Sequence, residues 1–321
     1  MKTKKVAIIT PGGDASGMNA CIRAIVRKGI SSGYEMFCIY HGYEGLLNNE
    51  IQKLSSRSVG GIIHLGGTIL KSSRCKKIQE ENYISIAAQI LKKNNIDYLV
   101  VIGGDGSLKA AHRLSGKGIK VIGIPASIDN DIPLTEETIG FDTAIDTAVE
   151  AIDKIRDTAM SFERIFIIEV MGREHGFLAL TVGIASGAEF VLIPEVKYNL
   201  NNLYKEIKKM EKIGKKTIFI IFAEGCGNPY TLANSIQKNT GLEVKVSSLG
   251  YIQRGGSPST RSRILACEFG VYAIELINQN KKNRVIVLQK NKVTDVFLGD
   301  VIKKEKTIDI KTYRLIKELA I

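Results

Sequence analysis

The sequence predicts an α/β fold with two similar lobes, each a mainly parallel sheet flanked by helices. Short apolar runs rich in β-branched residues alternate with amphipathic helical stretches along the chain, which is the pattern of parallel α/β folds. The apolar runs end at glycines or polar residues, as buried parallel strands do. Both halves repeat the order strand, turn, helix, strand, and no low-complexity segment or flexible linker is present.

Length and composition favour a two-domain cytoplasmic protein. The chain has 321 residues, 44% of them hydrophobic, and roughly 100–200 residues make one domain. No apolar run reaches the roughly 18 residues that a membrane-spanning helix needs, and residues 1–13 enter a strand and a glycine turn instead of a signal peptide. The five cysteines are odd in number and include no CxxC pair, which disfavours a disulfide framework and a zinc knuckle. We expect no membrane partner.

The formal net charge of +12 raises the alternative of nucleic-acid binding. The lysines, however, lie in scattered pairs, aromatic residues make up only 7% of the chain, and there is no Trp. No basic motif interleaved with aromatic residues is present, so solvated helix faces explain the charge better than a nucleic-acid partner does. A positive field would also attract polyphosphate substrates.

One segment combines two predicted strands, residues 98–102 and 121–125, with a predicted helix at 107–114 between them. Parallel strands end at one edge of a sheet, where the ligands of open α/β sheets bind. The first strand is followed by the sequence GGDGS, and the second by a polar loop that contains Asp129 and Asp131. Glycines let backbone N–H groups approach phosphates, and carboxylates supply metal ligands and proton acceptors. The two loops together predict a phosphoryl-transfer site, although either alone could be an ordinary turn or a solvated loop.

Two further features are typical of anion binding. A strand at residues 6–10 leads through Gly12 and Gly13 into a helix at 17–29, and a helix N-terminus after a glycine turn is a ready anion site. Arg23 and Arg27 are one turn apart on that helix and share a face, which could also be an ordinary solvated basic face.

The remaining elements are predicted from the same patterns. The expected strands lie at residues 35–40, 164–170, 217–223 and 285–288 (the last strand), and the expected helices at 82–94, 138–158, 203–213 and 261–279. We also expect a helix then a strand within 183–194, a glycine-rich turn at 42–45, and one helical stretch in the lysine-rich tail.

Several motifs resemble those of the bacterial-type ATP-dependent 6-phosphofructokinases, and the resemblance covers nearly the whole chain. They are the paired loops GGDGS and SIDND, LGGTILKSSR at residues 65–74, EVMGR at 169–173 and GYIQRGGSP at 250–258. The resemblance implies a glycolytic kinase that transfers the γ-phosphoryl group of ATP to the 1-hydroxyl of fructose 6-phosphate, giving fructose 1,6-bisphosphate and ADP. It also implies a larger ATP-binding lobe and a smaller sugar-phosphate-binding lobe, made respectively of residues 1–139 plus 252–302 and 140–251 plus 303–321.

The resemblance also assigns roles to individual residues. Asp129 would accept the proton of the attacking hydroxyl and Arg173 would stabilise the transferring phosphoryl group, with Ser127 and Arg74 assisting. Asp105 would lie near Mg²⁺, and Asp131 would assist the metal or orient Asp129. The implied ATP contacts are Gly13, Arg74, Cys75, Gly104, Asp105, Gly106 and Ser107. The implied sugar-phosphate contacts are Ser127, Ile128, Asp129, Arg164, Met171, Gly172, Arg173, Glu224, Lys245, Tyr251 and Arg254.

Regulation and assembly follow from the same resemblance. The implied effector residues, for ADP or another phosphorylated molecule, are Arg23, Arg27, Arg156, Glu189, Lys215 and Lys216. Arg156 and its neighbours Asp153 and Asp157 could instead simply face solvent, and Glu189 could be a surface carboxylate. Arg164 and Lys245 would complete the active site of a neighbouring subunit, which requires at least a dimer, and the assembly that the resemblance implies is a homotetramer.

The chain departs from the usual family pattern at several positions. Lys245 stands in place of an Arg and lacks its bidentate fork, Tyr251 stands in place of a His, and Ser127 in place of a Thr. At the effector site, Ser56 occupies a usual Arg position with Arg57 beside it, and Ile213 replaces a basic residue. These changes bear on affinity for the sugar phosphate and on effector binding.

The choice of phosphoryl donor can also be predicted. Similar enzymes that use pyrophosphate carry Asp at the position of Gly106 and Lys at the position of Ala126, and the small residues here favour ATP. The alternatives are a pyrophosphate-dependent or tagatose-6-phosphate kinase of the same fold, and a non-catalytic sugar-phosphate sensor. The presence of Asp105, Asp129 and Arg173 disfavours a sensor.

Overall fold

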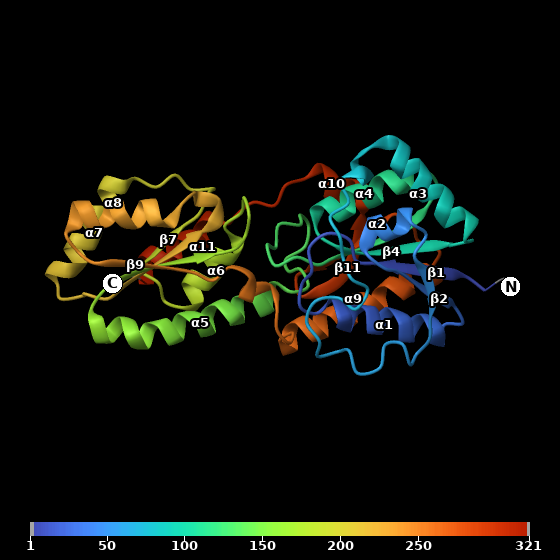
Figure 1. Cartoon of the computed structure of the whole chain (residues 1–321), viewed down its shortest axis with the longest axis horizontal. Coiled ribbons are helices and arrows are strands. Elements are labelled where there is room, and N and C mark those ends of the chain that lie inside the picture. The colour runs from blue at the N-terminus through green and yellow to red at the C-terminus, as the bar shows by residue number, and fades with distance from the viewer. Residues whose placement is uncertain (1–2, 320–321) are drawn as a thin grey trace. The chain divides into compact units, whose positions relative to one another are not determined.

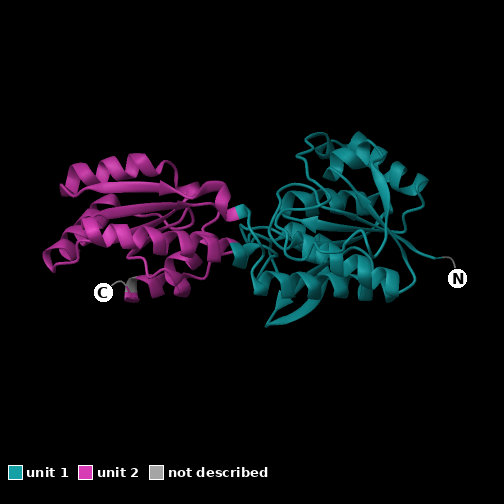
Figure 2. Cartoon of the chain, turned by 60° about the horizontal axis from the view of Figure 1, so that its bottom comes forward, with its two compact units in different colours: residues 1–143, 254–306 teal, residues 144–253, 307–321 magenta. Residues whose placement is uncertain are grey.

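The chain folds into two compact units. The structure is a computed structural model that describes residues 3–319 (Figure 1). Unit 1 comprises Met1–Thr143 and Arg254–Lys306, and unit 2 comprises Ala144–Gln253 and Thr307–Ile321 (Figure 2). The chain therefore passes from one unit to the other three times.

Unit 1 contains a seven-stranded sheet in the order β11-β10-β5-β4-β1-β2-β3. Its strands are β1 (Lys5–Ile9), β2 (Glu35–Ile39), β3 (Ile51–Leu54), β4 (Tyr98–Gly103), β5 (Lys120–Pro125), β10 (Arg284–Gln289) and β11 (Lys292–Phe297). The five strands from β10 to β2 pair in parallel, whereas β3 and β11 pair antiparallel at the two edges. The central strands β1 and β4 are apolar and almost wholly buried, as strands covered on both faces should be.

Helices cover both faces of this sheet (Figure 1). They are α1 (Met18–Ser31), α2 (Gly42–Leu47), α3 (Glu81–Lys93), α4 (Asp105–Gly116), α9 (Thr260–Asn278) and α10 (Leu298–Lys303), with a 3₁₀ turn at Lys77–Gln79. On one side α1 packs against α9, although more than 200 residues separate them in sequence. On the other side α2, α3, α4 and α10 pack with β1, β4 and β5 around one buried cluster that includes Leu99, Leu108 and Val121.

Unit 2 contains a smaller, four-stranded parallel sheet in the order β7-β8-β6-β9. Its strands are β6 (Ile165–Val170), β7 (Phe190–Leu192), β8 (Ile218–Ala223) and β9 (Val244–Ser248). Its helices are α5 (Phe141–Phe162, which begins in unit 1), α6 (Phe177–Ala185), α7 (Leu200–Lys212), α8 (Pro229–Thr240) and α11 (Ile310–Leu319), with 3₁₀ turns at Glu224–Cys226 and Gly250–Arg254. The helices α7 and α8 pack on one face around Ile167, Ile220 and Ile236. No helix among residues 3–319 is long and apolar enough to cross a membrane.

The predicted fold class is confirmed, but several elements differ from the prediction. Residues 42–45 begin the helix α2 and do not form a turn. Glycine is required at position 45 for a different reason, because a Cβ there would lie 1.8 Å from Tyr40 O. The strand at 285–288 is not the last, since β11 follows it, and the tail holds two helices, α10 and α11. The edge strands β3 and β11 and the helix α8 were not predicted. The sequences of β3 and β11 lack an apolar run because most of their side chains are not buried.

Candidate active site

The loops that follow β4 and β5 lie against each other in unit 1. The N–H of Ala126 donates a hydrogen bond to Gly103 O (3.1 Å). The next residues are also neighbours, because a Cβ on Gly104 would lie 3.8 Å from the Cβ of Ser127. The two loops that the sequence places on one sheet edge are therefore in contact.

The loop after β1 joins the same group through hydrogen bonds from two serine hydroxyl groups. Ser107 Oγ, in the first turn of α4, donates to Pro11 O (2.7 Å). Ser72 Oγ, from the segment that carries Arg74, donates to Gly12 O (2.5 Å). Three segments predicted to contact a nucleotide are thus held together by hydrogen bonds. Gly13 is half-buried in this group, and the side chain of Arg74 is exposed beside it.

The helix α4 begins two residues earlier than the sequence suggested, at Asp105. The early start places the first-turn N–H groups and the positive end of the helix dipole next to the GGDGS loop. A Cβ on Gly106 would meet no atom within 4 Å, so this side of the loop is open. Such a loop can bind phosphate oxygens through its backbone.

Asp129 lies in a loop whose two ends are paired with each other. Ser127 N donates to Ile139 O (3.0 Å), and Thr138 Oγ1 donates to Ser127 O (2.6 Å). Within this loop Asp129 is only 5% exposed, and its N–H donates to Ser127 Oγ (3.1 Å). The next residue, Asn130, has φ +51° and donates through Nδ2 to Glu136 O (3.1 Å). The backbone around Asp129 is therefore fixed from both sides.

Arg254 belongs to unit 1 and contacts the loop after β1. Its Nη2 lies 2.6 Å from Oδ1 of Asp14. The neighbouring carbonyl of Gly256 accepts a hydrogen bond from Ser16 Oγ (2.9 Å), which fixes the GGSP part of the motif against the same loop. Sequence reasoning missed Asp14, because the sequence around a carboxylate in a glycine turn does not indicate a partner 240 residues away.

Cys75, a predicted ATP contact, is half-buried. Burial is the main cause that raises the pKa of its thiol, and a hydrogen bond with Glu44 adds to it.

In unit 2, Arg173 lies where β6 and β8 end. Its backbone has φ +52°, and its N–H donates to Oε1 of Glu224 (2.5 Å). The N–H of Met171 donates to Oε1 of Gln253 (3.4 Å), a partner the sequence did not suggest. Gly172 between them is buried, with φ +140°. Glu224 thus braces the turn that presents the exposed side chain of Arg173.

Arg164 and Lys245 converge on one carboxylate that sequence reasoning missed, Glu243. Arg164 Nε lies 2.5 Å from Glu243 Oε2, and Lys245 Nζ lies 2.8 Å from Oε1. Hydrogen bonds from Lys245 and Arg164 lower the pKa of this carboxyl group. Of the remaining predicted sugar contacts, Ile128 is buried whereas Tyr251 is 76% exposed.

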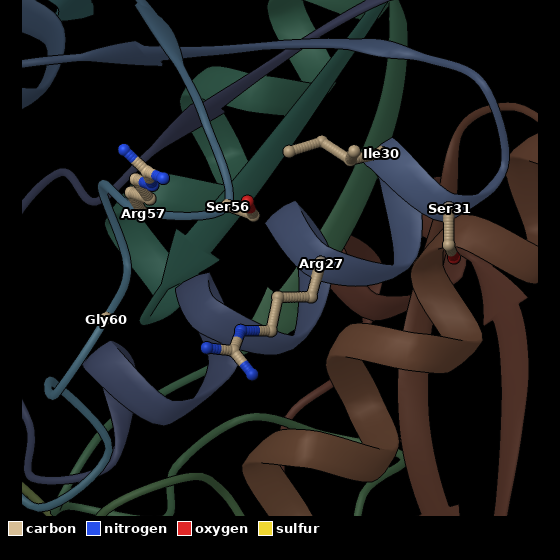
Figure 3. Close-up of a pocket in the computed structure, with 6 residues that line it drawn as sticks. All are labelled: Arg27, Ile30, Ser31, Ser56, Arg57 and Gly60. Carbon is tan, nitrogen blue, oxygen red and sulfur yellow. The ribbon is translucent and has the colours of Figure 1, made fainter.

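The predicted effector residues fall in both units. In unit 1, Arg27 and Arg57 line a pocket of about 610 Å³ between α1 and the segment after β3. Figure 3 shows Arg27 on the helix facing the loop that carries Ser56, Arg57 and Gly60. Arg57 thus supplies a cation to this pocket beside the serine that replaces the usual Arg. Arg23, one turn before Arg27, is half-buried on α1.

In unit 2, Arg156, Glu189 and Lys215 gather around the start of β8. Arg156 Nη2 donates to Ser186 O (2.5 Å), and its guanidinium lies 4.4 Å from the ring centroid of Phe219. Glu189 is only 7% exposed, accepts a hydrogen bond from Phe219 N (2.7 Å) and lies 3.0 Å from Lys215 Nζ. The alternatives of a solvent-facing Arg156 and a surface Glu189 are therefore wrong, although Asp153 and Asp157 are exposed. Lys216 instead pairs with Glu163 (2.7 Å).

A divalent metal ion that arrives with a nucleotide fits the residues of unit 1. The side chain of Asp105 is 42% exposed at the start of α4, with Oδ2 2.6 Å from Lys109 Nζ. Hard divalent ions bound with nucleotides usually take one or two carboxylates plus phosphate oxygens, so one carboxylate is enough. Across residues 3–319 no group of three or more His, Cys, Asp or Glu side chains could hold a metal by itself.

The fold is an α/β fold whose strand-end loops are suited to bind an anion, and comparison with known proteins gives the family of the chain. The phosphofructokinase family profile matches residues 5–277. ATP-dependent 6-phosphofructokinases of Bacillus cytotoxicus and Brevibacillus brevis are each 46% identical over 318 residues, covering 99% of this chain and 100% of theirs. This chain belongs to the phosphofructokinase family.

Solved structures agree with this assignment. Phosphofructokinase from Pichia pastoris in the T-state has a TM-score of 0.90 and 32% identity over 100% of this chain, which spans 37% of that longer chain. Phosphofructokinase from Saccharomyces cerevisiae has a TM-score of 0.87 and 31% identity, and the match covers 99% of this chain and 46% of the yeast chain. A pyrophosphate-dependent phosphofructokinase from Marinobacter aquaeolei shares the fold, with a TM-score of 0.85 at 22% identity over 96% of this chain and 86% of that one.

Proposed function

We propose that this protein is an ATP-dependent 6-phosphofructokinase of glycolysis, acting in the cytoplasm. It transfers the γ-phosphoryl group of ATP to the 1-hydroxyl of fructose 6-phosphate and gives fructose 1,6-bisphosphate and ADP. The observation that supports this proposal is the contact between the GGDGS loop and the loop that carries Asp129. Full-length relatives with that name support the choice of reaction.

Asp129 is the proposed general base. A carboxylate within reach of the attacking hydroxyl takes its proton as the new O–P bond forms, and such proton transfer contributes roughly 10²–10⁴-fold to the rate. The rest of phosphoryl transfer depends on positioning and charge stabilisation. Ser127 and Arg74 are proposed to bind the transferring group, and Arg173 to neutralise charge that develops on it.

ATP is the proposed donor, bound with Mg²⁺ near Asp105. Asp105 would hold the ion, which would supply positive charge to the phosphate groups when bound. The nucleotide contacts are proposed for Gly13, Arg74, Cys75, Gly104, Asp105, Gly106 and Ser107. The open space beside Gly106 supports this choice, since it leaves room for the adenylate part of the donor.

The sugar phosphate is proposed to bind through the residues that the family resemblance implies. Its 6-phosphate would meet Arg254 and Tyr251, with Arg164 and Lys245 contributed by a neighbouring subunit of a homotetramer. Ile128, Met171, Gly172 and Glu224 complete the set. The pairing of Arg164 and Lys245 with Glu243 supports a phosphate-binding role, because both cations already lie around one anionic group.

A turnover assay with purified protein tests the proposal. We expect coupled formation of ADP with ATP and fructose 6-phosphate, with much lower rates when pyrophosphate replaces ATP or tagatose 6-phosphate replaces the sugar. A preference for pyrophosphate would contradict the assignment of ATP as the phosphoryl donor. A preference for tagatose 6-phosphate would contradict the assignment of fructose 6-phosphate as the acceptor. The absence of turnover with every pair would favour a sugar-phosphate sensor.

The pocket of Arg27 and Arg57 is proposed to bind a phosphorylated effector such as ADP. Two arginine residues at one pocket favour a phosphorylated ligand. The pocket is open to solvent, so a ligand can enter it without a change in the protein structure. Arg57→Ala should abolish the response of the sugar saturation curve to ADP and leave the rate without ADP unchanged. Lys53→Ala, an exposed change on β3, is the matched control. An unchanged ADP response in Arg57→Ala would remove this pocket from the proposal.

A further inference from the structure

The loop of Asp129 is rich in acidic residues. Three acidic residues follow Asp129 in the loop: Asp131, Glu136 and Glu137. Glu137 Oε2 pairs with Arg261 (2.8 Å). However, Asp131 Oδ1 and Glu137 Oε1 are buried and accept no hydrogen bond from the part of the chain that the structure describes. Buried anionic oxygens of this kind are costly unless a nearby cation offsets them.

Lys306 supplies that cation from a distant part of the chain. Its Nζ donates to Glu136 O (3.3 Å), 170 residues away in sequence. Burial lowers the pKa of Lys306 to about 8, and the facing carboxylates of Asp131, Glu137 and Glu136 act in the opposite direction. The ammonium group is half-buried, and these three carboxylates favour its charged form.

The same carbonyl connects Lys306 to the neighbour of the proposed base. Glu136 O accepts one hydrogen bond from Lys306 Nζ (3.3 Å) and another from Asn130 Nδ2 (3.1 Å). Asn130 directly follows Asp129 and holds a left-handed conformation, with φ +51°. A shift of Glu136 would therefore move Asn130, and with it the backbone that orients the carboxylate of Asp129.

We infer that Lys306 is a positioning residue for phosphoryl transfer, which holds the Asp129 loop in its reactive arrangement through Glu136 and Asn130. This inference rests on the proposed function and names a residue outside the family motifs. Lys306 acts through its positive charge, because the oxygens around it are anionic or carbonyl. A misplaced reacting group costs up to roughly 100-fold in rate, so the effect is expected in kcat.

Three variants test the inference at pH 7. Lys306→Met removes the charge and keeps the length of the side chain, and Lys306→Arg keeps the charge. Lys304→Met, two residues earlier and exposed, is the matched control. We expect Lys306→Met to lower kcat roughly 10- to 100-fold with little change in the KM for ATP. Lys306→Arg should restore most of kcat, and Lys304→Met should match the wild type.

Hydrogen exchange gives a second readout that does not depend on turnover. In Lys306→Met the amides of residues 126–139 should exchange faster than in the wild type, while peptides of β1 and β4 stay protected. Lys306→Arg should keep the wild-type exchange. If Lys306→Met gives too little folded protein, Lys306→Gln replaces it, because Gln also lacks the charge.

The outcomes separate this inference from the proposed function. Wild-type protein that turns over no hexose phosphate contradicts the proposed function, yet exchange in residues 126–139 still tests the contact of Lys306. A wild-type kcat in Lys306→Met contradicts the inference, as does unchanged exchange in that variant. An equal decrease of kcat in Lys306→Arg and Lys306→Met also contradicts the inference, because the positive charge of Lys306 would then not determine the rate.

Discussion

The strand-end loops of unit 1 are joined by buried hydroxyl groups, whereas those of unit 2 are held by charged side chains nearer the surface. In unit 1, Ser107 donates to a backbone carbonyl of the neighbouring loop after β1, and Thr138 donates to a carbonyl at the other end of its own loop. In unit 2, Glu224 and Glu243 accept hydrogen bonds from groups that have themselves been predicted to contact the substrate. We propose that the fixed backbone groups of unit 1 bind the nucleoside triphosphate, and that the exposed cations of unit 2 bind a phosphate group that displaces a carboxylate. The predictions below test this difference.

The largest expected effect is at Asp129 in unit 1. Asp129→Asn should lower kcat by roughly 10²–10⁴-fold and leave fructose 6-phosphate binding in place, because the amide cannot take a proton. Steady-state kinetics and calorimetric titration measure the two quantities. Asp153→Asn, an exposed change on α5, is the control. Near-normal kcat in Asp129→Asn would exclude Asp129 as the base.

The counterpart in unit 2 is Arg173. Arg173→Met should reduce kcat by roughly 10²–10³-fold, the usual cost of removing one group that stabilises transition-state charge. Arg314→Met, an exposed change on α11, should have no such effect. If Arg173→Met instead raised only the KM for fructose 6-phosphate, Arg173 would contribute to substrate binding in the ground state and not to stabilisation of transition-state charge.

The next effect concerns the buried hydroxyl of Ser107. Ser107→Ala leaves the buried carbonyl of Pro11 without its donor and should lower the free energy of unfolding by about 1–3 kcal/mol. It should also raise the KM for ATP, because the loops after β1 and β4 lose a shared contact. Urea unfolding and kinetics provide the measurements. Ser85→Ala, whose exposed hydroxyl bonds within its own helix, should change stability by no more than about 0.5 kcal/mol.

Alkaline pH should act on Lys306. Its pKa is about 8 in the folded protein and about 10.4 when unfolded. Between these values the unfolded chain binds more protons, so stability rises with pH by at most about 1.4 kcal/mol per unit. Comparing wild type with Lys306→Met from pH 7.5 to 10.5 isolates this contribution. A constant difference between the two proteins would contradict the lowered pKa.

The smallest expected effect is at the exposed ion pairs of unit 2. Glu243→Gln should leave the unfolding midpoint nearly unchanged, because exposed pairs contribute little. It should lower the KM for fructose 6-phosphate by a few-fold, since Arg164 and Lys245 would no longer be shared with a carboxylate. A higher KM would indicate that Glu243 orients the two cations and does not compete with the phosphate.

Sequence reasoning worked where the signal is local. The runs that became β4 and β5 are apolar and bounded by glycine or polar residues, so their loops could be assigned to one sheet edge. It failed where the information lies in distant pairs. Asp14 meets Arg254 across 240 residues and Lys306 meets Glu136 across 170, and no periodicity or spacing encodes such contacts. The edge strands β3 and β11 were missed because exposed strands need no apolar run.

Unit 1 is completed only by residues from the last part of the chain. The strand β5 pairs with β10, and β10 with β11, so one side of β5 has no partner until residue 289 has been made. During synthesis on the ribosome, the edge of β5 therefore stays unpaired until β6 to β9 have been made and β10 has emerged. Unit 2 can complete its four strands first, and a nascent chain stalled before residue 284 should be a good client for a chaperone that covers exposed strands.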